Sequence, residues 1–258
     1  MLFIKRIPRL LRWITSVLLL FVFTMSVLRL IFFFSYNPPG KVFSGSAMLM
    51  GLRFDVKFAC IMAVTILILC SIPFVNPFKK FSAAKFWNTI LSFVFFIVLL
   101  VYAVDYFHYS YVQQRLNASI LSYFNDAAIT MNMGWQTYPV FKVMLLIVVV
   151  TIVFVFVFKK LLFNYQTQHV IDKRRGIGWY VVFFLLFALG IFGKIGQFNL
   201  RWSDAFTLND NFKGNLALNP FQSFFSTLRY RDTKPDITKV KQSYPMMADY
   251  LGVKDKNS

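Results

Sequence analysis

Most residues of this chain whose side chains could do chemistry lie in short polar stretches beside long apolar ones. Asp105 and His108 are three residues apart, which places them on one face of a helix, and Arg115 and Asn117 follow. Together such groups could orient a phosphate-bearing molecule or contact a second domain. The alternative is a polar helix end packed against the next segment. If Asp105 is buried there it needs an opposite charge, and Arg115 is the candidate partner.

A second pair lies in the motif Gly51-Leu-Arg-Phe-Asp55. Arg53 and Asp55 are two residues apart, so they share a face on a strand and diverge on a helix. The functional interpretation is that Arg53 binds a phosphate group, for which the guanidinium is suited. The alternative is a local ion pair at the end of a helix.

A third group, Arg201, Trp202 and Asp204, directly follows the last long apolar run. A tryptophan in this position is typical of an anchor at a membrane–water interface. The alternative is a docking surface for a soluble domain.

Metal and nucleophile chemistry have little support in the composition. The chain has two histidines and two cysteines, and its ten acidic residues are all aspartate. Cys60 and Cys70 lie ten residues apart in one apolar run, which is about 15 Å along a helix and too far for a disulfide. No Gly-x-x-x-x-Gly-Lys motif precedes the lysine runs. We therefore expect no catalytic residue, no metal site and no cofactor in this chain.

The stretches between these groups are long and apolar. Hydrophobic residues make up 58% and charged residues 15% of the chain, against roughly 25% charged in soluble proteins. The mean hydropathy is +0.59. The central run, Phe86 to Val104, has nineteen residues without a charge, and as a helix it would cover about 28 Å, close to the thickness of a bilayer's hydrocarbon core. The composition therefore predicts an all-α, polytopic membrane protein.

Five transmembrane helices are predicted in a domain of residues 1–200, at about 13–34, 58–75, 86–107, 138–158 and 179–198. The first contains Arg29 near its far end, and the fifth has to extend past Lys194 to reach a sufficient length. Both side chains are expected to reach out of the apolar region to the headgroups.

The remaining segments are predicted to lie outside the bilayer. Between the third and fourth spans, an amphipathic helix on the membrane surface is indicated by apolar residues at four-residue spacing: Val112, Leu116, Ile120 and Phe124. Residues 201–258 predict an extracytoplasmic linker, in which Asn219 and Pro220 are typical of a helix start and open a short helix to about Tyr230. Ser243-Tyr-Pro is typical of a linker without regular structure.

Basic residues predict how the chain sits in the membrane. The N-terminus, the second loop and the fourth loop carry twelve lysines and arginines, against five in the first and third loops. Because basic residues favour the cytoplasmic side, we expect the N-terminus inside, five crossings and the C-terminus outside. The net charge of +18 then reflects topology and contact with anionic lipid headgroups rather than nucleic acid.

Several motifs on the predicted outer side together resemble the lipoteichoic acid synthase family. They are Gly51-Leu-Arg-Phe-Asp55, Asp105-Tyr-Phe-His-Tyr109, Arg115-Leu-Asn117, Arg201-Trp-Ser-Asp-Ala-Phe206 and Asn215-Leu-Ala-Leu-Asn-Pro220. The resemblance covers essentially the whole chain, as that family's N-terminal membrane module and the start of its linker.

The resemblance implies a five-helix anchor in a bacterial cytoplasmic (inner) membrane, followed by an extracytoplasmic sulfatase-like domain. Members transfer phosphoglycerol or phosphoethanolamine from a phospholipid, using a threonine nucleophile and a divalent metal, often manganese. The family's nucleophile motif and metal ligands have no counterpart here. We therefore expect an anchor and lipid-presenting module whose catalytic domain is missing or separate, truncated at the linker and inactive alone. The alternative is a stand-alone membrane interaction or regulatory protein of the cell envelope.

Overall fold

The computed structural model describes residues 7–40, 42–121, 127–167, 173–229 and 237–252. Every regular element in these ranges is a helix, which confirms the all-helical prediction. The elements are α1 (Arg9–Tyr36), α2 (Gly45–Ser71), α3 (Phe81–Val112), α4 (Ala127–Thr137), α5 (Val140–Gln166), α6 (Lys173–Phe192), the 3-10 helix η3 (Trp202–Leu208), α7 (Asn211–Ala217), α8 (Pro220–Leu228) and α9 (Ile237–Tyr250).

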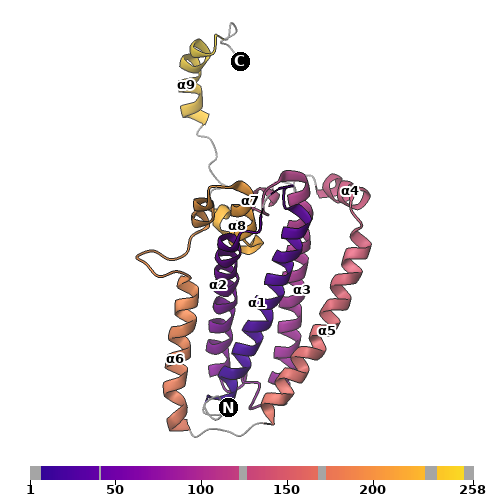
Figure 1. Ribbon diagram of the computed structural model, residues 1–258, viewed down its shortest axis with the longest axis vertical. Coiled ribbons are helices and arrows are strands. Elements are labelled where there is room, and N and C mark those ends of the chain that lie inside the picture. Colours follow the sequence, from indigo (N-terminus) through magenta and orange to yellow (C-terminus); the bar gives the residue numbers. More distant parts are fainter. Residues whose placement is uncertain (1–6, 41, 122–126, 168–172, 230–236, 253–258) are drawn as a thin grey trace.

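Four helices, α1, α2, α3 and α5, are long and apolar enough to cross a membrane, and they run side by side in Figure 1. By length and composition the chain is therefore a multi-pass membrane protein. The fifth predicted crossing corresponds to α6, whose apolar stretch, Gly176–Phe192, is shorter than in these four helices.

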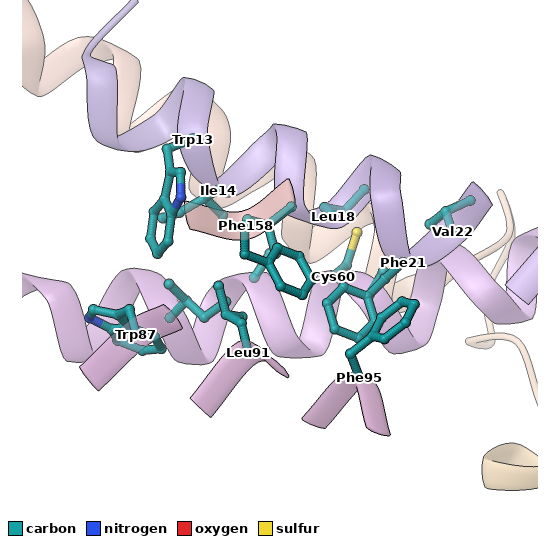
Figure 2. Packing of buried hydrophobic residues seen from close by; sticks show 14 of the residues in the cluster. Trp13, Ile14, Leu18, Phe21, Val22, Cys60, Trp87, Leu91, Phe95 and Phe158 are labelled. Atoms are coloured by element: carbon teal, nitrogen blue, oxygen red, sulfur yellow. The ribbon is translucent and has the colours of Figure 1, made fainter. Parts of the chain in front are cut away.

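The bundle is organised around α1, which packs against α2 and α5, while α3 packs on α5 and α6 packs on α2. Figure 2 shows the core between them, where aromatic rings from three helices meet. The ring of Phe21 on α1 lies 5.6 Å from that of Phe95 on α3 and 6.0 Å from that of Phe158 on α5. Most side chains of α5 face outward and are apolar, as lipid contact requires.

The predicted spans differ from the observed helices in their bounds, and the second and the fifth show where the prediction fails. The second is part of a longer helix, because α2 begins at Gly45 and ends at Ser71, before Pro73. The fifth was expected to continue to residue 198, but α6 ends at Phe192. Gly193 follows with a φ of +75° and donates its N–H to the Leu189 carbonyl at 3.0 Å. A glycine in the left-handed region is a common helix stop.

The predicted amphipathic helix between the third and fourth spans is wrong in its position. Helix α3 continues to Val112 and ends where Gln113 adopts a left-handed conformation, with φ 57°. The chain then bends at residues 113–114, has no regular structure at 115–117 and forms a 3-10 turn at 118–121, and α4 begins only at Ala127. Phe124 lies outside the described residues. The four-residue spacing is interrupted because contacts to Asp105, described below, hold Arg115 and Leu116 out of a helix.

After α6 the chain covers one end of the bundle. We call Leu200–Leu228 the cap; it comprises η3, α7 and α8 and lies across the end where α1 stops and α2 starts (Figure 1). The helix start predicted at Asn219 is confirmed, since its side chain accepts a hydrogen bond from the Gln222 N–H at 2.7 Å and Pro220 occupies the first turn.

Apolar contacts attach the cap to the bundle. Leu200, Ala217 and Leu218 form one buried cluster with Phe54 of α2. On α8, the ring of Phe221 stacks on Phe58 at 4.5 Å. Residues 217–221, which lie in the predicted linker, therefore pack against the helical body. Further along, the segment predicted as linker contains α9, with Pro245 inside the helix.

Candidate functional site

The first ion pair beneath the cap joins α1 to α2. The Arg29 Nη2 donates to Asp55 Oδ1 at 2.7 Å, and the two side chains are 2% and 0% exposed. Arg29 also donates to the carbonyls of Gly51, at 3.1 Å, and of the three consecutive cap residues Leu216–Leu218. The expected local pair of Asp55 with Arg53 is absent, because Arg53 points to the exposed side of α2. The expectation that Arg29 reaches the headgroups is also wrong.

Gly51 makes room for this arrangement. A Cβ atom at this position would overlap the guanidinium group of Arg29. The glycine that opens the Gly51-Leu-Arg-Phe-Asp55 motif is therefore required by the close approach of α1's arginine to the backbone of α2.

The second ion pair lies at the end of α3. Arg115 Nη1 donates to Asp105 Oδ2 at 2.5 Å, and the other carboxylate oxygen accepts the Leu116 N–H at 2.8 Å. Both charged side chains are buried. This pairing is the one predicted from the sequence for a buried Asp105. The Arg115 guanidinium also lies over the Phe32 ring, 4.2 Å from its centroid.

The two pairs meet at the cap residues 215–219. The Leu218 carbonyl accepts from Arg29 at 3.2 Å and from two nitrogens of Arg115 at 3.1 and 2.6 Å. Asn219 Nδ2 donates to Asp55 Oδ1 at 3.2 Å, and the Asn215 side chain accepts the Arg115 N–H at 3.3 Å. We call these residues the polar clamp: Arg29, Asp55, Asp105, Arg115, Asn215, Leu216–Leu218 and Asn219.

The clamp is suited to holding the cap. Its two arginines and two aspartates sum to zero charge, and each charged side chain is at least 98% buried. Buried ion pairs are tolerated when further hydrogen bonds satisfy the remaining donors, and here cap carbonyls accept from most of the guanidinium nitrogens. Arg29 Nε and Asp55 Oδ2 are buried without a hydrogen-bond partner among the described residues. The carboxylates do not fit a manganese ion, because each already faces a guanidinium. The arrangement can fix one segment on another.

The other predicted site residues lie outside the clamp. Arg53 is exposed on α2, and His108 Nδ1 lies 3.1 Å from the Gln114 carbonyl. Asn117 is used in a turn, where its side chain accepts the Ser119 N–H at 2.9 Å. The last three predicted residues lie at the start of the cap: Arg201, Trp202 and Asp204.

Asp204 ties the start of the cap to the end of α6. Its Oδ2 accepts the Arg201 N–H at 2.8 Å and the Lys194 ammonium at 2.8 Å. Partial burial of the carboxylate opposes its ionisation, but these two donors outweigh burial and lower the pKa of Asp204 below its usual value. Lys194 thus has a partner within the protein, whereas the sequence predicted that it would reach the headgroups.

Sequence reasoning missed several members of the clamp. Arg29 carries a usable signal, because a cation inside an apolar run needs a partner at membrane depth. The sequence around Asn219 predicts a helix cap but not the hydrogen bond that its amide group donates to Asp55. The carbonyls of Leu216–Leu218 carry no side-chain signal at all.

Comparisons with known proteins add no relative: no protein-family model, curated protein or solved structure matches this chain.

Proposed function

We propose that this chain is the membrane anchor and lipid-presenting module of a lipoteichoic-acid-synthase-like phosphoglycerol or phosphoethanolamine transferase in cell-envelope biogenesis. The observation that supports this most is the polar clamp. The clamp makes the segment after α6 a platform fixed on the bundle, where an unattached linker would leave a following domain free to swing.

A fixed platform is useful to an enzyme that acts on lipid. Tethering a catalytic domain to the membrane raises its effective concentration at a lipid substrate without new contacts. A platform bonded directly to α1, α2 and α3 also fixes the place at which the chain leaves the bundle towards that domain. The proposal places the cap outside a bacterial cytoplasmic membrane, in line with the distribution of basic residues, and makes α6 the fifth crossing.

Exposed cationic and polar groups remain available for headgroups at this end of the bundle. Arg53 and Arg201 are exposed, and His108 is only partly covered. They could contact lipid phosphates while the buried arginines hold the cap. Manganese and the threonine nucleophile would belong to the sulfatase-like domain that the resemblance implies, since the buried carboxylates here are already paired.

A fusion experiment tests the proposal. The sulfatase-like domain of a lipoteichoic acid synthase is joined after Ser258, and the fusion is reconstituted in liposomes with manganese and fluorescent phosphatidylglycerol. Release of fluorescent diacylglycerol is expected at least tenfold faster from the fusion than from the same domain added in solution, and not at all from the chain alone.

The matched control is the fusion carrying Asp55→Asn, which is expected to keep the tether but lose much of the acceleration because the platform loosens. Equal rates for the fused and free domains would contradict the proposal and favour the stand-alone interaction protein. Turnover by the chain alone would also contradict it.

A further inference from the structure

The segment between α6 and the cap forms a loop that is closed at its base. We call residues 193–199 the closed loop. At its base, the Leu200 N–H donates to the Phe192 carbonyl at 2.8 Å. From α2, Lys57 Nζ donates to the Leu200 carbonyl at 2.6 Å. Both ends of the loop are therefore held at the same place beside α2.

The tip of the closed loop is apolar and faces away from the protein. Ile195 is fully exposed and Phe198 is 58% exposed. Figure 1 shows the loop projecting sideways from the bundle, beside the cap-side end of α6. It continues from the apolar outward face of that helix, which exposes Val181, Leu185 and Leu189. If this face of α6 contacts lipid, the loop that follows it lies at the level where the hydrocarbon layer ends.

Cations flank this apolar tip. The Arg201 guanidinium lies over the Phe198 ring, 4.9 Å from its centroid, and within the described residues it makes no side-chain hydrogen bond. The Arg201 charge already acts on the Asp204 carboxylate, but no side-chain hydrogen bond to a described residue occupies its N–H donors, which can therefore bind a ligand beside the loop. Lys194, at the start of the loop, donates to the same Asp204 carboxylate oxygen that accepts the Arg201 backbone N–H. Apolar tips flanked by arginine and tryptophan are typical of segments that sit in the interfacial layer of a membrane.

We propose that the closed loop inserts into the phospholipid leaflet on the cap side. Ile195 and Phe198 enter the boundary between headgroups and acyl chains, and the Arg201 guanidinium binds a lipid phosphate. The loop would then fix the depth of the cap directly, through Leu200, in addition to the polar clamp. This inference requires that α6 lies in the membrane and is independent of any transferase activity.

Depth-dependent quenching tests the inference on the full chain in liposomes. Cys60 and Cys70 are replaced by alanine, and Gln197→Cys in the loop is labelled with an environment-sensitive fluorophore. Phospholipids brominated near the headgroup are expected to quench this label at least twofold more than a label at Asn211→Cys, which lies exposed on α7. Adding Ile195→Ser and Phe198→Ser should lower the quenching at residue 197 to the control level, while Arg201→Gln should lower it in part.

Three results would overturn the inference. Quenching by aqueous iodide in place of brominated lipid would show the loop in water. Protection from both quenchers would show it covered by protein, including a second copy of this chain. Unchanged lipid quenching in the Ile195→Ser/Phe198→Ser variant would show that the apolar tip does not set the depth. Far-UV circular dichroism of each variant verifies that the helices remain intact.

Discussion

Within the part of the chain that the structure describes, Arg29 makes five hydrogen bonds at the capped end of the bundle. It contacts α2 through Asp55 and Gly51 and the cap through the carbonyls of Leu216–Leu218. Removing one partner of a buried pair leaves the other charge without compensation in a medium of low dielectric constant. The loss then exceeds what the intact pair contributes to stability.

Asp55→Asn keeps the shape of the side chain but removes the negative charge facing Arg29. We expect the free energy of unfolding in mixed micelles, measured by titration with a denaturing detergent, to fall by about 3–5 kcal/mol. Arg53→Gln, two residues away on the exposed side of the same helix, is the control and should change it little. Similar losses in the two variants would show that the buried pair has no special role.

The sequence predicts one of the two buried ion pairs and misses the other for a definite reason. A buried Asp105 needs a cation as its partner, and Arg115, ten residues further along the chain, is near enough in sequence to be predicted as that partner. Arg29 and Asp55 lie on different helices, and the nearer Arg53 was the obvious alternative. Which partner is used depends on how α1 and α2 are rotated, and the sequence alone does not specify that rotation.

Among the elements, α8 has two roles at its first turn. The Asn219 side chain accepts from Gln222 as a helix cap and donates to Asp55 in the clamp. A lost cap costs about 1 kcal/mol, and a lost hydrogen bond to a charged group costs about 1.5–3 kcal/mol. One substitution at this position therefore weakens the helix and its attachment together.

Asn219→Ala is expected to make the cap open more often, so that trypsin cleaves at Lys213 and Arg229 at least tenfold faster in micelles. Asn219→Ser keeps a capping oxygen and should have a smaller effect. Ser226→Ala, which removes only a hydrogen bond from Gln222 within α8, is the control. Equal cleavage rates in Asn219→Ala and Ser226→Ala would contradict a link between α8 and the clamp.

Helix α6 depends on a close contact with α2. A Cβ atom on Gly190 would overlap the Cys60 sulfur, whereas one on Gly178 would meet no other side chain within 4 Å. Overpacking of this kind costs about 1–3 kcal/mol.

Gly190→Ala should lower the melting temperature in detergent and raise the reactivity of Cys60 toward a maleimide, because α6 is displaced from α2. Gly178→Ala, in the same helix, should leave Cys60 unreactive and the melting temperature unchanged or higher, since alanine favours a helix. An unreactive Cys60 in both variants would argue against this packing.

The elements that the sequence predicts well are those with a strong local signal. Long uncharged runs indicate α1, α2, α3 and α5, and Asn219-Pro220 indicates the start of α8. The misplaced helix after Val112 had a regular apolar spacing, but hydrogen bonding to Asp105 overrides it. The sequence does not predict α9, because Pro245 is typical of a linker, whereas the structure accommodates this proline within the helix.

For the whole molecule, the distribution of basic residues predicts which side of the membrane each end of the bundle faces. Ser82 and Ser203 are both exposed and lie at opposite ends of the bundle. In intact cells, a membrane-impermeant maleimide should label Ser203→Cys and should label Ser82→Cys only after permeabilisation. The parent chain, whose Cys60 and Cys70 are buried, is the unlabelled control. The reverse pattern would place the cap in the cytoplasm and remove the basis of the proposed function.

The polar clamp also constrains how this protein is made. Arg29 leaves the ribosome early, yet its acceptors at Leu216–Leu218 are synthesised 187 to 189 residues later. Until then α1 and α2 carry charges whose final hydrogen bonds do not yet exist. Those charges must instead interact with the insertion machinery or with lipid headgroups. The hydrogen bonding of the first two helices is therefore completed only after the cap has been synthesised.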